Sequence, residues 1–101
     1  MAVISVLDFR FNPDTVEDAL KVVHSILKDT REFEGCERVA VVQDVDDPAH
    51  IQFVEHWRSP ADDQAYRAWR AGGGGGESVA ALGQYLLAAP TTTVSQVRDD
   101  I

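Results

Sequence analysis

The sequence predicts an α+β domain whose elements follow the order β-α-β-β-α-β. Four stretches are rich in β-branched and aromatic residues, and helical periodicity separates the first from the second and the third from the fourth. A short polar turn joins the second stretch to the third, as in a hairpin. This order is typical of the ferredoxin-like arrangement, a four-stranded antiparallel sheet with helices on one side.

The first strand is expected over Ala2–Phe11, because apolar residues alternate along both of its faces. Asn12 and Pro13 end it and open a helix that runs to about Arg31, with Asn12 as the expected N-cap. The apolar residues of this helix form one stripe: Val16, Ala19, Leu20, Val23, Ile26 and Leu27. The stripe predicts that the helix packs one face against the sheet.

A hairpin is expected next, with strands over Glu37–Val45 and Ile51–Arg58 and an acidic turn between them. Along the second of these strands, alternation puts four side chains on one face: Ile51, Phe53, Glu55 and Trp57. His56 is expected on the opposite face, at an interface between two copies of the chain or at an edge.

The ends of the next helix predict its position at Pro60–Ala71. Ser59 is a favourable N-cap, Pro60 suits the first helical position, and Gly72 closes the helix. Five consecutive glycines occupy positions 72–76, and no regular element tolerates their entropy cost. We therefore expect a flexible joint there. Because the run lacks the Lys-Ser/Thr of a phosphate loop, we do not expect it to bind phosphate.

The last part of the chain is expected to form a helix and a strand. Glu77–Ala89 has its apolar residues in line at helical spacing, and Pro90 ends the pattern. Thr91–Arg98 is rich in β-branched residues and is predicted to be a short final strand.

Length and composition limit the class of protein. A chain of 101 residues with 45% apolar and 26% charged residues is expected to form one globular domain over residues 1–101. The net charge of −8 makes nucleic acid and anionic membranes poor partners. Cys36, the single cysteine, cannot form an internal disulfide, and neither a spanning apolar run nor a signal peptide is recognisable. We therefore expect a cytoplasmic protein.

The predicted sheet has more apolar surface than one chain can cover. Three strands carry apolar residues on both faces. Val6 and Phe9 are expected on opposite faces of the first strand, and Val41 and Val42 on opposite faces of the second. The helices of this arrangement cover one face only. An antiparallel sheet with its other face exposed to water should carry polar residues on that exposed face. Two sheets packed face to face bury on the order of 2,000 Å² or more, as in obligate dimers. We therefore predict a homodimer formed through the open sheet face.

Several motifs together resemble those of one family. They are Glu34-Gly-Cys36 ahead of a strand, an acidic turn with Pro48, Phe53-Val-Glu-His-Trp57 and Ser59-Pro-Ala-Asp. This pattern resembles the antibiotic biosynthesis monooxygenase family over roughly Val3 to Val97. The resemblance implies a dimeric α+β barrel with a pocket between sheet and helices in each subunit. The family's activities include cofactor-independent oxygenation of aromatic polyketides and quinols, and haem degradation in some relatives.

One position departs from the family pattern. Family members often carry a histidine about nine residues after the tryptophan, where this sequence has Tyr66. The haem-degrading relatives resemble one another in a haem-ligating histidine on that helix and an asparagine on the first strand. Here Ser59–Ala71 contains no histidine and Ala2–Phe11 contains no asparagine. The resemblance therefore disfavours haem degradation and leaves the oxygenase chemistry.

An oxygenase without metal or flavin needs a substrate that itself donates an electron to dioxygen, as a phenolate or hydroquinone anion can. The protein must bind this small aromatic molecule, remove a proton and stabilise the anion in a mostly apolar site. The expected catalytic residues are Tyr66 and His24, which would handle the proton, and Trp57, which would stack on the ring. The expected substrate-binding residues are Trp69, Phe53 and Glu55. No cofactor and no metal are expected, because the three histidines are scattered and the single cysteine has no second to pair with.

Each candidate also has a structural explanation. The two tryptophans are typical of core or interface packing, and Tyr66 and His24 of half-exposed helix positions. Glu55, if it is buried, needs a partner, for which Arg58 and Arg70 are candidates.

Two other functions are compatible with the same fold, because fold alone does not decide function. One is a non-catalytic small-ligand-binding or structural protein, and the other is an isomerase acting on a lactone or diene. Ligand binding without turnover, unchanged by Tyr66→Phe and His24→Ala, favours the first, and product analysis identifies the second. An empty cavity of a few hundred Å³ with Trp57 and Tyr66 in its wall would fit a ligand site.

Overall fold

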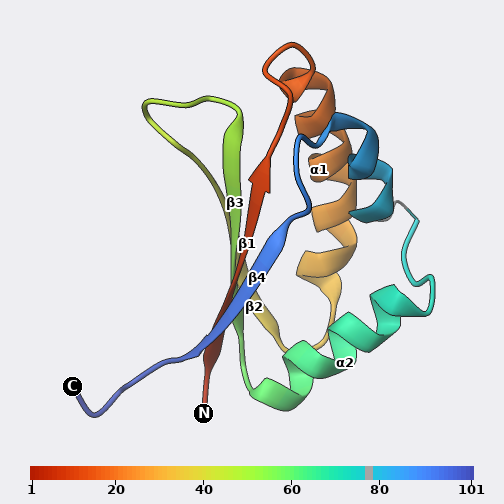
Figure 1. Ribbon diagram of the computed structural model, residues 1–101. Coiled ribbons are helices and arrows are strands. Elements are labelled where there is room, and N and C mark those ends of the chain that lie inside the picture. Colours follow the sequence, from red (N-terminus) through yellow and green to blue (C-terminus); the bar gives the residue numbers. More distant parts are fainter. Residues whose placement is uncertain (77–78) are drawn as a thin grey trace.

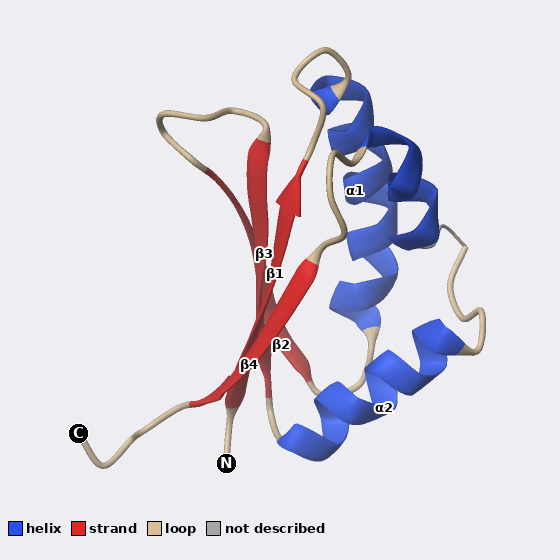
Figure 2. Ribbon diagram, viewed as in Figure 1, coloured by secondary structure: helices blue, strands red, loops and turns tan. Residues whose placement is uncertain are grey.

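The helices lie against one face of a single antiparallel sheet, and the other face is open (Figures 1 and 2). The computed structural model describes residues 1–76 and 79–101. The strands are β1 (Val3–Arg10), β2 (Cys36–Gln43), β3 (His50–Trp57) and β4 (Thr91–Gln96). The helices are α1 (Val16–Glu32), α2 (Pro60–Ala71) and the 3₁₀-helix η1 (Val79–Tyr85). The strand order β2-β3-β1-β4, with every neighbouring pair antiparallel, confirms the predicted ferredoxin-like topology.

Strand pairing determines which residues share a face of the sheet. One row crosses all four strands: Val39, Glu55, Ser5 and Val94. Because the Ser5 hydroxyl donates to Asp63 of α2, this row faces the helices. The next row points to the open face: Ala40, Val54, Val6 and Thr93. The prediction that apolar residues occupy both faces is therefore confirmed at the centre of the sheet.

The main core lies between the central strands and α1. It includes the stacked or tilted rings of Phe9, Phe11 and Phe53 and most of the predicted α1 stripe, in which Leu20 is partly buried. A second, smaller cluster joins Val3, Trp57 and Tyr66 at the end of the sheet that α2 covers. None of the described helices is long and apolar enough to cross a membrane.

The predicted ends of α2 are confirmed, whereas the predicted start of α1 is wrong. Ser59 caps α2 by accepting the backbone N–H of Asp62 at 3.2 Å, and Gly72 ends the helix. Asn12 instead accepts the N–H of Asp14 at 2.9 Å in a local turn, so α1 begins at Val16, with Thr15 at the N-cap position. Asn12 thus bonds to the backbone of a turn, a use that competes with helix capping.

The second strand ends two residues earlier than expected. The Asp44 carboxylate accepts the N–H groups of Asp46 and Asp47 at 2.8 and 3.1 Å, which turns the chain after Gln43. Val45 is therefore in the turn and 95% exposed, rather than on a strand face.

The expected helix over Glu77–Ala89 is wrong in length and type, and its first two positions lie outside the described residues. The chain forms the short 3₁₀-helix η1 and then pairs with the end of β1. Asn12 donates to the Tyr85 carbonyl at 2.8 Å, and Leu87 donates to the Arg10 carbonyl at 2.9 Å. These bonds to residues distant in sequence outweigh a local helical pattern that already contains Gly83. The last strand, β4, ends at Gln96 rather than Arg98.

Candidate functional site

Four aromatic rings meet where α2 crosses the end of the sheet. Trp57 lies 4.9 Å from Tyr66 between ring centroids, and Tyr66 lies 6.0 Å from Trp69. Phe33, in the connection after α1, contacts all three rings at 5.1 to 6.2 Å. The structure therefore brings together three of the predicted site residues. Phe33 was missed by the sequence interpretation, although an aromatic residue directly before the turn at Gly35 was a signal for it.

The Tyr66 hydroxyl links the two α-helices. It lies 2.5 Å from the Thr30 hydroxyl of α1, and the Arg70 Nε donates to it at 2.7 Å. Arg70 continues this link, because its Nη2 donates to the Ile26 carbonyl at 2.8 Å and to Thr30 at 3.1 Å. Tyr66 is thus a buried tyrosine with hydrogen-bonded partners, not the half-exposed one considered from the sequence.

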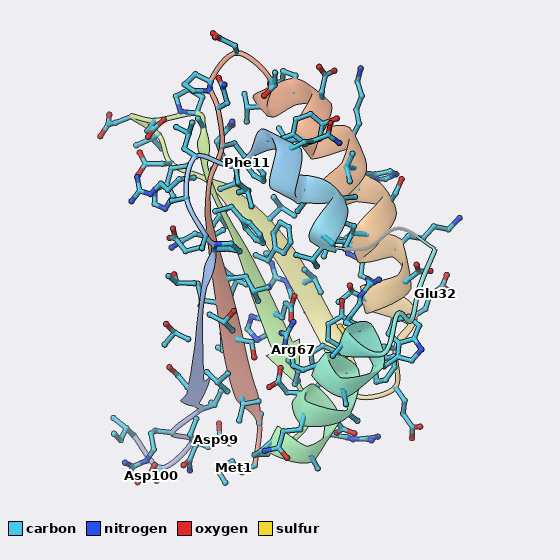
Figure 3. The ribbon with its side chains drawn as sticks, turned by 45° about the vertical axis from the view of Figure 1, so that its right-hand side comes forward. Met1, Phe11, Glu32, Arg67, Asp99 and Asp100 are labelled. Carbon is cyan, nitrogen blue, oxygen red and sulfur yellow. The ribbon has the colours of Figure 1, made fainter. Side chains whose placement is uncertain are left out.

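A buried charged cluster adjoins these rings on the helix-facing side of the sheet. Arg67 of α2 reaches between α2 and the sheet, where its Nη2 donates to Glu55 and lies 3.2 Å from Asp63 (Figure 3). The Trp57 indole N–H donates to the same Glu55 oxygen at 3.1 Å, and Ser5 donates to Asp63 at 2.9 Å. The cluster thus joins β1, β3 and α2.

The expected partners of Glu55 are corrected by this geometry. Arg58 instead pairs with Asp62 at 2.9 Å near the surface, and Arg70 binds the Tyr66 hydroxyl. Arg67 was not considered, although its i,i+4 spacing from Asp63 is a recognisable helical ion-pair signal.

Burial dominates the electrostatics of Glu55. Its side chain is almost inaccessible, and this desolvation raises the pKa of its carboxyl above the ordinary value, against the opposing effect of Arg67. Burial and the charge of Glu55 likewise raise the pKa of the nearby Cys36 thiol. A thiol with a raised pKa is a poor nucleophile, so Cys36 has no catalytic advantage here.

The other two predicted site residues lie apart from this cluster. Phe53 is buried in the main core, 4.5 Å from the Phe9 ring. His24 is exposed on α1, beside a surface hollow of about 390 Å³. That hollow and two others, of about 280 and 180 Å³, are not lined by Trp57 or Tyr66. The two rings pack directly against each other, in the region where an empty cavity would have fitted a ligand site.

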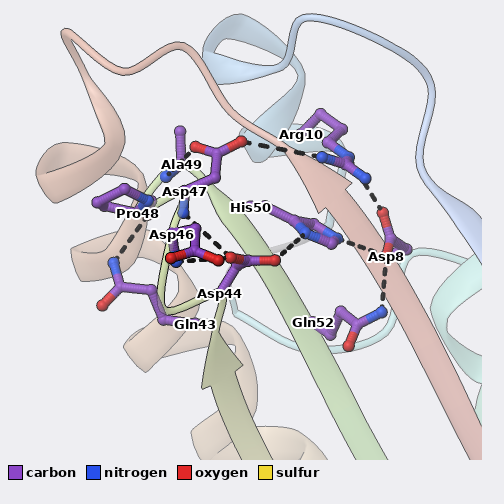
Figure 4. Close-up of polar contacts among 10 residues, drawn as sticks. All are labelled: Asp8, Arg10, Gln43, Asp44, Asp46, Asp47, Pro48, Ala49, His50 and Gln52. Carbon is purple, nitrogen blue, oxygen red and sulfur yellow. Dashed lines mark hydrogen bonds and ion pairs between the residues drawn. The ribbon is translucent and has the colours of Figure 1, made fainter.

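A second polar cluster lies at one end of the open sheet face (Figure 4). The His50 Nε2 lies 2.7 Å from an Asp8 oxygen that also accepts the Gln52 amide at 2.7 Å, and its Nδ1 lies 3.4 Å from Asp44. The hydrogen bond to Asp8 raises the pKa of His50, and the same contact lowers the pKa of Asp8. Arg10 extends the cluster with ion pairs at 3.8 Å to Asp8 and Asp47.

Among residues 1–76 and 79–101, no three His, Cys, Asp or Glu side chains form a group that could hold a metal ion.

Comparisons with known proteins agree with the fold. The sequence model of the family described as "Antibiotic biosynthesis monooxygenase" matches residues 2–74. A conserved protein from Methanosarcina mazei has a similar structure, with 20% identity, a TM-score of 0.82 and coverage of 97% of this chain and 94% of that one. No curated protein has a matching sequence.

Two further solved structures are similar. One, named antibiotic biosynthesis monooxygenase, is 19% identical with a TM-score of 0.79, covering 97% of this chain and 99% of its own. The other, Rv0793 from Mycobacterium tuberculosis, is 19% identical with a TM-score of 0.75, covering 98% and 97%. At these identities the structural similarity establishes the fold alone.

Proposed function

Because the chain belongs to the antibiotic biosynthesis monooxygenase family, we propose that it is a cofactor-independent monooxygenase acting on an aromatic polyketide or quinol-type substrate. The observation on which this proposal rests is the aromatic cluster of Trp57, Tyr66 and Trp69 beside the ion pair of the buried Glu55 with the half-buried Arg67. Aromatic faces bind a flat ring, and a buried charged pair beside them provides the proton and anion chemistry that the reaction requires.

For an anthrone-like substrate, the reaction converts a ring CH₂ group and dioxygen into C=O and water. The substrate loses four electrons and dioxygen gains them, so no external reductant is required. The step that the protein must assist is removal of a proton, since the carbanion or phenolate is the species that donates an electron to dioxygen. A buried, mostly apolar site holds this anion with fixed hydrogen-bond donors and excludes competing water.

The side of the site nearest β4 is where a substrate would enter. The helix-facing residues of β4 are exposed, and Val94, opposite Ser5, is 51% exposed. The rings of Trp57 and Tyr66 already contact each other, so binding requires the half-buried Trp69 at the rim to move. Neither α1 nor α2 covers this edge of the sheet (Figure 1).

The proposed active form is a cytoplasmic homodimer that joins two open sheet faces. The centre of this face is apolar, with Ile4, Val6 and Val54 on neighbouring strands and the exposed Val42 beside them. A second copy of the chain would remove these side chains from water and leave the helix-facing site free. The polar cluster around His50 lies at the end of the same face and would border the interface.

Oxygen consumption tests the proposed activity. The protein, stripped of metal with chelator and without added flavin, is mixed with a panel of hydroquinones and anthrones. We expect oxygen uptake with at least one substrate and a rate at least tenfold lower in Trp57→Leu than in the unmodified protein, since Trp57 contacts Glu55 directly. No uptake with any member of the panel contradicts the proposal.

A second candidate is a non-catalytic ligand-binding or structural protein of the same fold. The observation that favours it is the complete packing of Trp57 and Tyr66, whose polar atoms all have partners within the chain. This candidate predicts that hydroquinones bind without being oxidised and that Tyr66→Phe changes stability but not affinity.

A further inference from the structure

The buried cluster of Glu55, Asp63 and Arg67 holds one positive charge against two carboxylates. Glu55 is 1% exposed and Asp63 is nearly as buried, whereas the Arg67 side chain is 31% exposed and reaches inward from the surface. A buried carboxylate without a full counter-charge is costly. One additional proton makes the cluster neutral, so the site favours taking up a proton from a molecule bound beside it.

Glu55 is the member of the cluster best suited to receive that proton. Desolvation raises the pKa of its carboxyl, whereas Asp63 already accepts a hydrogen bond from the Ser5 hydroxyl at 2.9 Å. The Trp57 indole and Arg67 both bind one Glu55 oxygen, Oε1, and fix the orientation of the carboxyl group. A proton acceptor must be oriented in this way relative to the group it deprotonates.

Arg67 provides the matching site for an anion. Among residues 1–76 and 79–101, its Nε is the one fully buried side-chain nitrogen or oxygen without a hydrogen-bond partner. The guanidinium also lies over the Tyr66 ring, 5.0 Å from its centroid. A buried N–H without an acceptor is unfavourable, and an oxyanion beside the ring would satisfy it with a charge-assisted bond.

We infer that Glu55 is the proton acceptor of this site and that Arg67 Nε–H holds the oxyanion of a phenol or hydroquinone after deprotonation. The substrate O–H bond breaks, an O–H bond forms on Glu55, and the electron pair stays on the phenolic oxygen beside Arg67. Glu55 and Ser5 lie in one row of the sheet with Val94, which is 51% exposed on β4. This inference rests on the proposed function but replaces Tyr66 and His24 as the groups that take the proton.

The test uses para-nitrophenol as the probe, since its phenolate absorbs visible light and the phenol does not. Binding is measured at a pH below the pKa of the free probe and above that of an ordinary glutamate. Calorimetry in two buffers of different ionisation enthalpy counts the protons released.

We expect the unmodified protein to bind the probe as phenolate with almost no proton released, because Glu55 keeps the proton. Glu55→Gln should either lose the phenolate absorbance or release about one proton per bound probe. The control Glu37→Gln, an exposed position on β2, should behave as the unmodified protein.

Arg67→Lys keeps the charge but removes the Nε–H, and we expect it to bind the phenolate about tenfold more weakly or worse. The control for Arg67→Lys is Arg98→Lys, because Arg98 forms an exposed ion pair with Asp100. Urea midpoints verify that both variants are folded. The inference is overturned if the unmodified protein does not bind the probe, or if it releases one proton on binding the probe as phenolate. It is also overturned if Glu55→Gln gives the same phenolate absorbance and the same proton count as the unmodified protein.

These results separate the two proposals. If the protein retains the proton of para-nitrophenol as expected but oxidises no anthrone or hydroquinone, the role of Glu55 is supported and the proposed oxygenase activity is wrong. If substrates are oxidised and Glu55→Gln has the same rate and pH profile as the unmodified protein, the oxygenase activity is supported and the proposed role of Glu55 is wrong.

Discussion

Tyr66 combines a structural role with a position inside the candidate site. Its ring contacts Trp57 and Trp69, while its hydroxyl bonds to Thr30 and Arg70 and so fastens α2 to α1. The alternation of β3 predicted that Glu55 and Trp57 share a face, and pairing confirms this. The partner of Glu55 was not predictable in the same way. Arg58, Arg67 and Arg70 are all near in sequence, and only the crossing of α2 over the sheet selects Arg67.

Removing the Tyr66 hydroxyl should reduce stability. Tyr66→Phe deletes one buried and one partly buried hydrogen bond, although Arg70 and Thr30 keep their bonds to the Ile26 carbonyl. We therefore expect a loss of about 1–2 kcal/mol in the free energy of unfolding, measured by urea denaturation. Tyr85→Phe, a half-buried position on η1, is the matched control and should stay within about 0.5 kcal/mol. Equal stability of Tyr66→Phe and the unmodified protein would mean that the hydroxyl does not fasten the helices.

At the scale of elements, local signals predicted some boundaries and missed others. The ends of α2 follow from Ser59, Pro60 and Gly72, whose effects are local and therefore readable in sequence. The region after the glycine run was mispredicted, because Tyr85 and Leu87 bond to residues at the end of β1. Such long-range pairing leaves no periodic signal in the sequence.

The glycine run makes a defined contact with α2. The Gly74 N–H donates to the Trp69 carbonyl at 2.9 Å, and a Cβ at position 74 would lie 2.3 Å from the Trp69 ring. We expect Gly74→Ala to displace Trp69 and to lower the free energy of unfolding by about 1–3 kcal/mol. Gly83→Ala, where a Cβ meets no atom within 4 Å, should be neutral or slightly stabilising. Trp69 fluorescence that is unchanged in Gly74→Ala would contradict the contact.

The pairing of β1 with β3 should depend on pH through His50. Because Asp8 raises the pKa of His50, the contribution of this contact is fully present below the ordinary histidine pKa of about 6.5. This contribution is lost as the pH rises through the higher pKa that His50 has in the folded protein. Urea denaturation across this range should show that the difference in the free energy of unfolding between the unmodified protein and His50→Gln shrinks with increasing pH. His56→Gln, on the same strand and face, is the control, and a pH-independent difference for His50→Gln would count against the contact.

At the scale of the whole molecule, two kinds of side chain are divided between the two faces of one sheet. The helix-facing side carries the rings and the buried charges, and the open side carries the apolar row with Val6 and Val54. Sequence alternation alone was sufficient to predict apolar residues on both sides. It was not sufficient to predict that aromatic side chains fill the space between α2 and the sheet, since packing depends on how α2 crosses the strands.

The apolar open face should make the protein a dimer in solution. A charge at its centre cannot be buried without a partner, so Val54→Lys should convert the dimer to a monomer. Light scattering coupled to size-exclusion chromatography measures the mass of each form. Val45→Lys, on the exposed turn beyond β2, should remain a dimer. An unmodified protein that is monomeric at micromolar concentration contradicts the proposed assembly.

The most direct test of the proposed function follows the fate of dioxygen. Metal-stripped protein is given an anthrone under isotopically labelled dioxygen, and the product is analysed by mass spectrometry. We predict a quinone that carries one labelled oxygen atom, with formation greatly slowed in Glu55→Gln and unaffected in Glu37→Gln. A product without label, or equal formation in the presence and absence of the protein, would contradict the assignment of this chain as a cofactor-independent monooxygenase.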